Sequence, residues 1–551
     1  MKKNKINKLI IFEIVAGIII FGLYYYITLP VLNIHAAEFW SLSFFVLIYA
    51  LICVAINTST KLISSFNGPQ GTEINFNKEG FTLPMKIILS LLVICIVVPF
   101  LWAGISAPFF NANEYSQRID MKEVDFSEIP EIDANKTPII DRESTIRLGD
   151  KVMGQMPELV SQFNVSEEYT QISYKDAVYR VTPLEYASFI KYFKNRGEGI
   201  PAYIRVNSTT GKAELVKLKD LGFDNMKYTP SAYFNENLMR KLRFKYPTQI
   251  FGSPSFEVDE KGHPYYICTT YTYKGVNTKK TVTGVIVFNP IDGTSKKYGL
   301  KDIPNWVDRV YPEDLLITQI DDHGRYQKGF FNSIIGQEGV IVTSEGYNYI
   351  EKDGDIWLYS GLTSATKDAA NLGFVLVNTR THESLKISTP GANETSAMSS
   401  AEGEVKNYGY KSTFPLLVNI KGNPVYLMSL KDDAGLIKMY ATVSAIDYQK
   451  VTVVSADEGI KELIDKTLIS FGDNNVIDDK KLIAKDIIVS NVEKVLVNDT
   501  TMYYILSSEN EKFKIKFDTK YEDKLVFLKS GDVLKIKYVS GEAYNTIKKI
   551  S

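Results

Sequence analysis

The chain contains little cysteine and histidine, and it has no excess charge of either sign. Only 3 cysteines and 4 histidines occur among 551 residues, and 63 basic residues nearly balance 64 acidic ones, giving a formal net charge of -1. A nucleic-acid-binding surface normally needs a basic excess to displace counterions. The balanced charge therefore argues against nucleic acid as a partner.

The small number and the placement of the cysteines exclude a fold that is held together by disulfide bonds. Cys53 and Cys95 fall in long apolar runs, and Cys268 is the only cysteine in the rest of the chain. A large region without disulfides must be held together by its own hydrophobic cores. Cys268 lies near His263, but side chains five positions apart on a strand face opposite sides. We therefore expect a buried core thiol at Cys268 rather than a nucleophile with its base.

The histidines do not indicate a metal centre. His35, His263, His323 and His382 are far apart in the sequence, and no Cys-x-x-Cys motif accompanies them, so no zinc-ligand spacing is present. The sequence also lacks Gly-x-Ser-x-Gly and the phosphate-binding Gly-x-x-x-x-Gly-Lys motif. It therefore assigns no catalytic, cofactor-binding or metal-binding residue, and it implies no cofactor.

Long apolar runs stand out in the first 110 residues. They extend from Leu9 to about Ile34, from Phe39 to about Asn57, and from Met85 to about Phe109. Each is long enough to cross a hydrocarbon core, which takes roughly 20 helical residues. The sequence therefore predicts three transmembrane helices. A cleaved signal ending near "HAAEF" is the alternative for the first run, but the run is longer than a usual signal core, which favours an uncleaved span.

Lysine placement predicts the orientation of the spans. Four lysines precede the first span, Lys61 and Lys78 lie in the loop between the second and third, and Lys86 lies at the start of the third. The loop between the first two has neither lysine nor arginine. Positively charged loops stay in the cytoplasm. We therefore expect a cytoplasmic N-terminus and an extracytoplasmic C-terminal region, and the lysine-, isoleucine- and asparagine-rich composition favours a bacterial plasma membrane.

Composition and pattern divide the chain into five segments. Residues 1–110 form the transmembrane region, and residues 111–142, which are acidic and contain prolines, are predicted to form an extended linker. Extracytoplasmic α+β modules are expected in pairs over 143–310 and 311–455. A β-rich domain is expected over 456–551.

Helix signals open each module. Apolar residues at helical spacing predict a helix over 144–163, and Thr182, Pro183 and Glu185 match a capping box for a second helix ending near Asn195. Thr229 with Pro230 marks another start in the same way. A further helix is expected from about 312, and a fourth module begins with the candidate helix "TSAMSSAEGEVKNYGY".

Antiparallel hairpins follow these helices and recur along the chain. An apolar strand ends in asparagine and turns back in "VNSTTG" at 206–211, "FNPIDG" at 288–293 and "VNTRTH" at 377–382. A second type of turn carries Gly262, Gly354 and Gly422, and the first two are 92 positions apart. Two turn types that move together along the chain indicate an internal duplication.

The helix, apolar strand, Val-Asn-x-x-Thr-Gly turn and return strand resemble the PepSY-type modules of exported and membrane-anchored bacterial proteins. "VNSTTG" carries the resemblance, "FNPIDG" matches it less well, and "VNTRTH" departs from it because His382 replaces the glycine. The resemblance covers roughly residues 180–450 and implies a regulatory, chaperone-like or inhibitory role toward exported enzymes. The whole chain also resembles a family of multi-span Gram-positive membrane proteins with a large extracytoplasmic domain.

The last segment has the pattern of short strands. After a predicted helix in "EGIKELIDKTLISF", apolar and polar residues alternate between turns at 498–499, 508–510 and 530–531, which suits a small barrel or sandwich. The final "KSGDVLKIKYVSGEAYNTIKKI" resembles the last hairpin of OB-like barrels. Such a barrel can bind oligomers, but a terminal packing module is the simpler interpretation.

A cluster of polar residues is the main candidate for chemistry. Asp321, Asp322, His323 and Arg325 fall together in a predicted exposed turn. They would bind a cation or act as acid and base, or they simply end the helix and solvate the turn. Asp353 and Asp355 lack the remaining ligands of a calcium loop, so a plain turn is expected there.

Two further patterns have weaker implications. Ser364 and Lys367 form a Ser-x-x-Lys pair, the spacing at which a lysine activates a serine on a helix, but the companion motifs are missing and a chance match is favoured. Glu13 lies in the first span. A carboxylate there can mark an ion path, although Glu13 is close enough to the basic tail to reach the interface.

The sequence thus predicts a membrane-anchored α+β protein with three N-terminal transmembrane helices, repeated PepSY-like helix-and-hairpin modules, and a β-rich, OB-like C-terminal module. The expected function is non-enzymatic binding or regulation of an envelope protein or cell-wall component. One alternative is an envelope hydrolase or peptidase that uses the Asp321–Arg325 cluster. The other is a subunit of a membrane export or transport complex, in which Glu13 matters. No binding residue and no oligomeric state are indicated.

Overall fold

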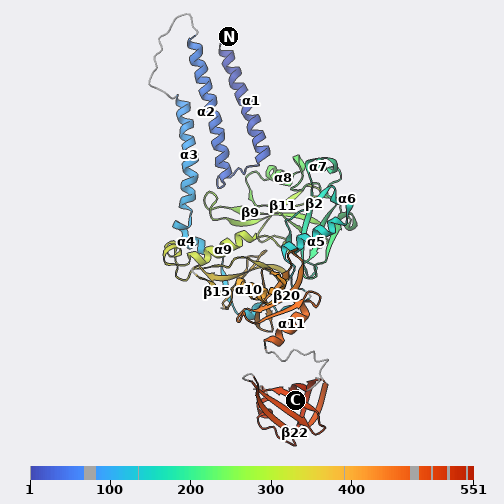
Figure 1. Ribbon diagram of the computed structural model, residues 1–551. Helices are drawn as coiled ribbons and strands as arrows, with labels where there is room; N and C mark the ends of the chain where they lie inside the picture. Colours follow the sequence, from blue (N-terminus) through green and yellow to red (C-terminus); the bar gives the residue numbers. More distant parts are fainter. Residues whose placement is uncertain are drawn as a thin grey trace. The chain divides into compact units, whose positions relative to one another are not determined.

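The computed structural model describes residues 2–66, 82–134, 136–365, 367–389, 391–471, 483–497, 500–517, 521–540 and 544–550. The chain divides into two compact units, Met1–Gln449 and Lys450–Ser551 (Figure 1). Each unit is described by itself.

Three long apolar helices begin the first unit. Within α1 (Lys2–Thr28), α2 (Ala37–Phe66) and α3 (Leu83–Ile105), stretches of 21, 22 and 23 residues are long and apolar enough to cross a membrane. Three long apolar helices are therefore present where the spans are predicted. Lys78, one of the lysines that predicts their orientation, lies outside the described residues. The first span ends earlier than predicted because Leu29, with φ of 52°, leaves the helix directly before Pro30.

Antiparallel sheets with one repeated topology make up the rest of the first unit. In the first sheet, the long strand β4 (Ala177–Tyr186) pairs with β3 (Thr170–Tyr174) along its first half and with β2 (Phe163–Val165) near its end. β5 (Ala202–Asn207) and β6 (Ala213–Lys217) then continue the meander. One edge of the sheet therefore consists of two short segments, β2 and β3, separated by a gap. We call this edge the interrupted inner strand.

The same order occurs in every sheet of this unit that the structure describes. The second sheet contains β7 (Ile250–Phe251), β8 (Ser255–Val258), β9 (Pro264–Thr272), β10 (Thr281–Phe288) and β11 (Ser295–Gly299). The third contains β12 (Ile341–Thr343), β13 (Asn348–Lys352), β14 (Asp355–Ser364), β15 (Lys367–Asn378) and β16 (Ser384–Ile387). The fourth contains β17 (Lys411–Ser412), β18 (Leu416–Ile420), β19 (Asn423–Lys431) and β20 (Ile437–Ser444).

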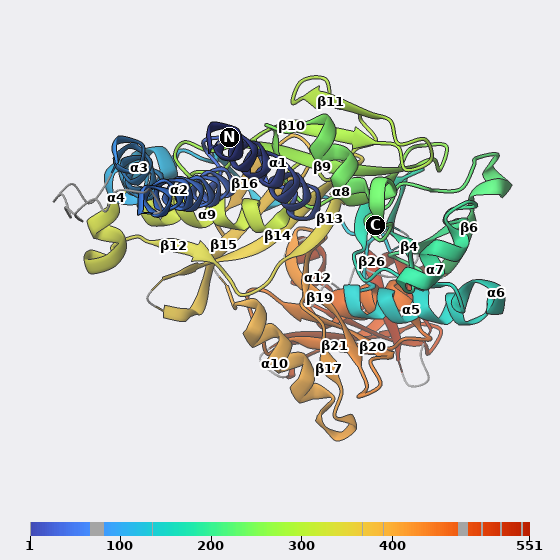
Figure 2. The ribbon, with the colours of Figure 1, turned by 90° about the horizontal axis from the view of Figure 1, so that it is seen from above.

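A helix precedes each sheet and the sheets form a ring (Figure 2). The helices are α5 (Arg142–Gly154), α8 (Leu238–Lys245), α9 (Glu313–Tyr326) and α10 (Glu394–Glu404). Inner strands of neighbouring sheets meet, since β3 contacts β8 and β13 contacts β18. The first and second sheets share one hydrophobic core, and the second and third share another. Radial repetition of such sheets is the plan of β-propellers.

The ring is closed by the segment predicted to be an extended linker, and that prediction is wrong. Within residues 111–142, β1 (Met121–Val124) pairs in parallel with β16. Asn419 Nδ2 donates to the Ile129 carbonyl at 2.9 Å, and Ile119, Ile129 and Ile140 are buried. Isolated isoleucines between charged residues give no periodic pattern, so their burial could not be read from the sequence.

Two predicted helix starts are also wrong. Thr182, Pro183 and Glu185 lie within β4, and the helix α7 (Phe189–Asn195) begins later, with Ser188 as its N-cap. The Thr182 hydroxyl donates to the carbonyls of Ser166 and Glu168 instead of capping a helix. Pairing of β4 with β5 is a tertiary effect that overrides the local capping pattern.

The other corrected start is in the second module. Thr229 and Pro230 do not begin a helix; α8 begins at Leu238, where the Asn237 side chain accepts a hydrogen bond from Arg240 N at 3.0 Å. The helix predicted over 144–163 is split into α5 and α6 (Pro157–Val160), because a proline disfavours helical geometry at the residue before it.

The second unit contains β21 (Val451–Ser455), α11 (Gly459–Ser470) and a closed barrel. Around the barrel the order is β22 (Ile483–Val497), β23 (Thr500–Ser507), β24 (Lys512–Lys516), β26 (Asn545–Ile550) and β25 (Val533–Val539), with α12 (Glu522–Leu525) between β24 and β25. Buried residues such as Phe513 and Ile505 fill its interior. The short strands agree with the predicted alternation, while the predicted turn at 498–499 lies outside the described residues.

Candidate functional site

The ring encloses a cavity of about 700 Å³. The interruptions of the inner strands open onto it and contribute Ser166, Glu168, Tyr169, Ser253, Pro254, Tyr347 and Phe414. A repeated structural feature therefore builds the site from four distant parts of the sequence. The volume lies within the roughly 300–1,000 Å³ of small-molecule sites.

Arg180 on β4 is the most unusual residue of the cavity wall. Its side chain is buried, with a relative exposure of 8% for the residue. Nε donates to Gln171 Oε1 at 3.1 Å, but Nη1 has no hydrogen-bond partner among the described residues. No carboxylate in the described part of the chain forms an ion pair with it. A buried cation is normally paired, but the described residues supply Arg180 with only a neutral partner, Gln171.

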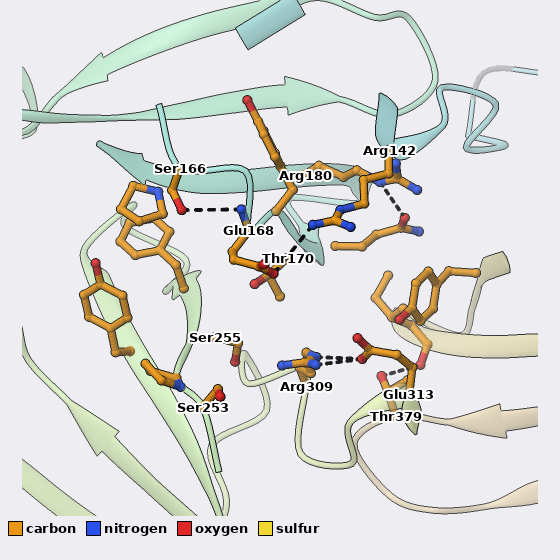
Figure 3. Close-up of a pocket in the computed structure, with 18 of the residues that line it drawn as sticks. Arg142, Ser166, Glu168, Thr170, Arg180, Ser253, Ser255, Arg309, Glu313 and Thr379 are labelled. Atoms are coloured by element: carbon orange, nitrogen blue, oxygen red, sulfur yellow. Dashed lines mark hydrogen bonds and ion pairs between the residues drawn. The ribbon is translucent and has the colours of Figure 1, made fainter. Parts of the chain in front are cut away.

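A second guanidinium lies on the same wall (Figure 3). Arg142, at the start of α5, donates to the Glu167 carbonyl at 3.0 Å and lies 3.7 Å from a carboxylate oxygen of Glu168. The Glu168 side chain is 88% exposed, so this ion pair is weak and water-screened. Burial lowers the pKa of Arg180, and the nearby Arg142 charge lowers it further, although the carboxylate of Asp141 opposes both effects. A guanidinium remains cationic in proteins nonetheless.

On the facing wall of the cavity, the arginine is paired with a carboxylate. Arg309 donates from Nε and Nη2 to the same oxygen of Glu313, at 3.0 and 2.7 Å. Figure 3 draws this pair across the cavity from Arg142 and Arg180. The contrast between the two walls localises the unpaired positive charge to the side formed by α5 and β4.

Aromatic side chains add flat surfaces to the cavity. Tyr169 and Tyr266 both line it, and neither buried hydroxyl has a hydrogen-bond partner among the described residues. Burial raises the pKa of both hydroxyls, so they remain neutral and can donate or accept. Tyr347 and Phe414 contribute further aromatic lining. Chemically, the cavity suits an anionic group attached to a part that packs against aromatic rings.

Two buried carboxylates lie behind this wall. Glu257 on β8 is fully buried, and its oxygens accept from Asp308 N at 2.8 Å and Arg309 N at 3.2 Å. Burial raises the pKa of Glu257 to about 7. Asp308 accepts from Ser173 N at 2.8 Å, and burial together with the Glu257 charge raises its pKa well above the usual value. These carboxylates join the first two sheets, and the Asp308 carbonyl accepts from Thr379 Oγ1, after β15 of the third sheet, at 2.8 Å.

The predicted polar cluster on 321–325 lies elsewhere and does not form an exposed turn. Helix α9 continues through these residues to Tyr326. Asp322 pairs with Arg118, His323 Nδ1 lies 2.7 Å from the Ser116 carbonyl, and Asp321 accepts from Thr343 N at 2.9 Å. The side chains thus hold α9 to its neighbours.

Gly324 explains why the helix was predicted to end too early. A Cβ at this position would meet the Ile341 carbonyl oxygen at 1.9 Å. The glycine permits close approach between α9 and β12 instead of ending the helix. A glycine in a helix lowers helix propensity, so the packing requirement could not be distinguished from a helix stop in the sequence.

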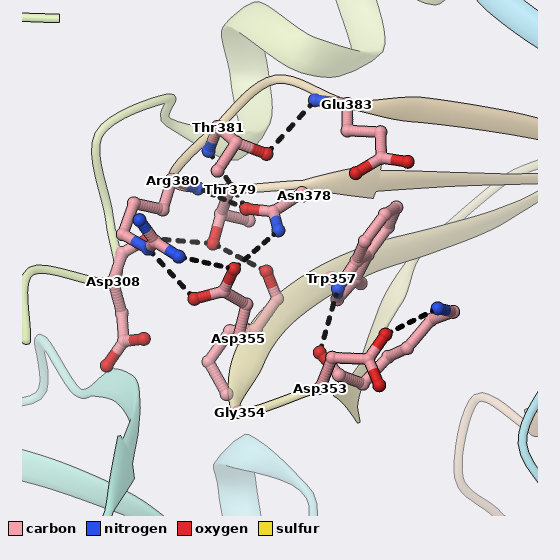
Figure 4. Close-up of polar contacts among 12 residues, drawn as sticks. Asp308, Asp353, Gly354, Asp355, Trp357, Asn378, Thr379, Arg380, Thr381 and Glu383 are labelled. Atoms are coloured by element: carbon pink, nitrogen blue, oxygen red, sulfur yellow. Dashed lines mark hydrogen bonds and ion pairs between the residues drawn. The ribbon is translucent and has the colours of Figure 1, made fainter. Parts of the chain in front are cut away.

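The third asparagine turn is a structural corner (Figure 4). Asn378 Oδ1 accepts from the backbone N–H groups of Arg380 and Thr381, both at 2.9 Å. Arg380 donates through two nitrogens to both oxygens of Asp355, at 2.8 and 2.7 Å. Asp353 pairs with Lys352 at 2.7 Å. These aspartates are therefore engaged in the turn, and the described residues contain no group of three His, Cys, Asp or Glu that could hold a metal ion.

The other residues that the sequence singled out also occupy structural positions. Ser364 and Lys367 are paired backbone positions of the β14–β15 hairpin, where helical Ser-x-x-Lys geometry does not occur. Cys268 is fully buried, as expected, and burial raises the pKa of its thiol to about 12. Glu13 on α1 accepts from Asn57 Nδ2 on α2 at 2.6 Å, so it contributes to packing between two spans.

The sequence did not single out the residues of the cavity. Arg180 lies in "YRVTPLEY", part of which matches a helix start, and Arg142 falls at the end of the predicted linker. A charged residue at a buried position of an alternating strand is the one local signal, and it becomes visible only once β4 is recognised as a strand.

Comparisons with known proteins do not assign a family. No family model matches the chain, and no curated protein matches it. Among solved structures, the chain is similar to a levansucrase from B. megaterium with 9% identity and a TM-score of 0.17, covering 77% of this chain and 98% of that one. It is also similar to an alpha-L-arabinofuranosidase from Lactobacillus brevis, with 8% identity, a TM-score of 0.16, and coverage of 69% and 92%. Scores this low do not establish a shared fold.

Proposed function

We propose that this chain is a membrane-anchored, non-enzymatic binding protein whose central cavity takes an anionic group of an envelope ligand. The ligand is a peptide or cell-wall segment that carries a carboxylate or phosphate. The observation that carries this proposal is Arg180, a buried guanidinium on the cavity wall whose Nη1 has no partner among the described residues.

The energetics of burial support an anion as the missing partner. An unpaired buried cation costs several kcal/mol, and a carboxylate or phosphate oxygen forms strong charge-assisted hydrogen bonds with a guanidinium. Arg142 adds a second positive charge on the same wall. The aromatic lining then accommodates the uncharged remainder of the ligand.

A binding function is favoured over the hydrolase and transport alternatives, because the residues on which those alternatives depend already have contacts within the protein. The Asp321–Arg325 cluster, the basis of the hydrolase alternative, is occupied by contacts with Arg118, Ser116 and Thr343. Glu13, the basis of the transport alternative, is hydrogen-bonded to Asn57 on the neighbouring span. Both groups thus have a packing role that explains their presence.

The proposal includes location and module identity. We place the protein in a bacterial plasma membrane with a cytoplasmic N-terminus and with all of the chain after the last span outside the cytoplasm. A helix before each sheet supports PepSY-like repeats, for which regulation of exported enzymes is the implied role. The strand order β22-β23-β24-β26-β25, with α12 between β24 and β25, supports an OB-like barrel.

Calorimetric titration of the full-length protein in neutral detergent tests this function. The probes are inorganic phosphate, citrate and the soluble peptide-bearing fragments released by muramidase from bacterial cell walls. We expect binding of the wall fragments, with citrate or phosphate competing according to whether a carboxylate or a phosphate is recognised. Heat changes that are insensitive to both competitors, or no binding by any probe, would contradict an anion site.

A further inference from the structure

An exposed apolar surface lies on the first and second repeats. Helix α7 is inserted between β4 and β5 and buries only Tyr192. Its other large apolar side chains are exposed, at 45% for Phe189, 74% for Ile190 and 61% for Phe193. Phe234 and Phe244 extend the surface at 48% and 55% exposure. We call these five residues the α7–α8 foot.

A second exposed apolar surface lies after α9. Phe331, Ile334 and Ile335, in and next to the short helical segment Asn332–Gly336, are exposed at 64%, 58% and 79%. Phe110 on α4 (Pro108–Ser116) is exposed at 67%. We call these four residues the α4 foot. Contiguous exposed apolar groups on a folded protein usually mark an interaction site.

Both feet are continuous with the ends of the membrane spans. At the end of α1, Tyr25 packs edge-on against Phe244, with ring centroids 5.5 Å apart. Arg240 and Arg243 of α8 donate to the carbonyls of Tyr26 and Leu29 at 3.1 and 3.0 Å. These contacts hold the α7–α8 foot beside the point where the first span ends.

The α4 foot has the same relationship to the third span. Helix α4 begins at Pro108, directly after α3 ends at Ile105. Phe109 then contacts the rings of Phe330 and Phe331, at centroid distances of 5.2 and 5.7 Å. Figure 1 draws α7 and α8 at the end of the first unit from which the spans rise, and α4 directly below the end of α3, beside α9.

We propose that both feet insert into the interfacial layer of the membrane leaflet in which α1 and α3 end. Aromatic and aliphatic side chains at the end of a span lie at the boundary between headgroups and acyl chains. The exposed Lys194 of α7 is placed among the apolar residues of the first foot, where its ammonium can reach lipid phosphates. The occupant of this surface is lipid, and the ring rests on the bilayer at two points.

Depth-dependent fluorescence quenching tests the proposal on the full-length protein, at one molecule per lipid nanodisc. Single cysteines are introduced by Ile190→Cys and Ile335→Cys in a background without native cysteines and labelled with an environment-sensitive fluorophore. Tyr408→Cys is the matched control because Tyr408 is also aromatic and 66% exposed, but lies in the fourth repeat. The nanodiscs contain lipids with a spin label near the top of the acyl chain.

We expect blue-shifted emission and strong quenching at positions 190 and 335, with neither change at 408. Quenching at only one of the two feet overturns the two-point arrangement. Unquenched, water-like emission at both overturns lipid as the occupant and assigns these surfaces to a protein partner instead. Because each probe sits on an exposed side chain, and thermal unfolding of each variant is compared with that of the parent, misfolding is separable from lack of insertion.

Discussion

The Nζ atom of Lys431 lies 2.9 Å from Asp141 Oδ2, and this ion pair joins the fourth sheet to the helix before the first. Lys431 also pairs with Glu143 at 2.6 Å, and only 9% of its side chain is exposed. Because burial alone would raise the pKa of Asp141, the net lowering shows that hydrogen bonds from Ser144 and Lys431 outweigh desolvation. Lys431 thus closes the ring of sheets.

Lys431→Met is expected to destabilise the ring. It removes two charge-assisted hydrogen bonds and leaves Asp141 without its cation, so the free energy of unfolding should fall by about 1–3 kcal/mol. Lys438→Met is the matched control, since Lys438 pairs with Asp432 with 42% of its side chain exposed, and surface pairs contribute less than about 1 kcal/mol. Equal effects of the two variants in thermal unfolding would exclude a closing role for Lys431.

The buried Glu257 predicts a specific pH dependence of stability. Its folded pKa of about 7 lies above its ordinary value of 4.5, so the folded state retains a proton that the unfolded state loses. The contribution of this group to stability is therefore greatest below pH 4.5 and falls as the pH rises toward 7. Glu257→Gln, which stays neutral, should reduce the loss of stability between pH 5 and pH 8.

Urea unfolding of the wild type and Glu257→Gln at pH 5 and pH 8 measures this difference. Burial also raises the pKa of Asp308, which remains titratable in the variant, so the variant should weaken the pH dependence without abolishing it. An unchanged difference between the two pH values would show that Glu257 is already ionised in the folded protein at pH 5.

His382 occupies a glycine position in a repeated turn. Its φ is 68°, close to the 71° and 75° of Gly211 and Gly293 in the equivalent turns. The imidazole compensates for the backbone strain by stacking on Tyr311, with centroids 4.4 Å apart, and by lying 2.9 Å from Gln319 Oε1. His382→Ala loses these contacts and keeps the strain, whereas His382→Gly loses the contacts but relieves the strain.

We therefore expect His382→Gly to be more stable than His382→Ala by about 0.5–1 kcal/mol in chemical denaturation. The reverse order would show that strain at this residue is negligible. Burial also lowers the pKa of His382 to about 4. The folded state holds a neutral imidazole, so the wild type should lose stability as the pH falls from about 6.5 toward 4, and both variants should lose less.

The proposed orientation of the protein is tested by cysteine accessibility. Thr210→Cys, in the exposed turn between β5 and β6, should react with a membrane-impermeant maleimide in intact cells. Native Cys268 is fully buried and its thiol pKa is raised to about 12, so it should react only after mild denaturation. If the thiol introduced at position 210 were labelled only after membrane disruption, the ring would lie in the cytoplasm.

Local features of the fold could be predicted from the sequence, because local interactions determine them. The asparagine turns are an example: the side-chain oxygens of Asn207, Asn289 and Asn378 each accept from backbone N–H groups two residues later along the chain. The same local signals failed where long-range pairing prevailed. Thr182 and Pro183 satisfy a capping pattern, yet pairing with β5 places them in a strand.

The site could not be predicted in this way. Arg142 and Arg180 are far apart in the first repeat, and Arg309 lies between the second and third sheets; they line one cavity only because interrupted inner strands surround it. Asp321 and His323 attracted attention because they are close in sequence, but each has its own packing partner in a different element. Proximity in sequence therefore indicated the Asp321–Arg325 cluster, whereas the fold places a different set of polar residues, the arginines, around the cavity.

Arg180→Met tests the central claim most directly, with Arg196→Met as a control at an exposed arginine that is paired with Glu236. The measurement is the affinity of the full-length protein for the wall fragments, together with its stability without ligand. We predict that Arg180→Met loses about 30-fold or more in affinity while its ligand-free stability is unchanged or increased, because an unpaired buried charge is removed. Unchanged affinity together with a marked loss of stability would contradict the account, since Arg180 would then serve the fold and not a ligand.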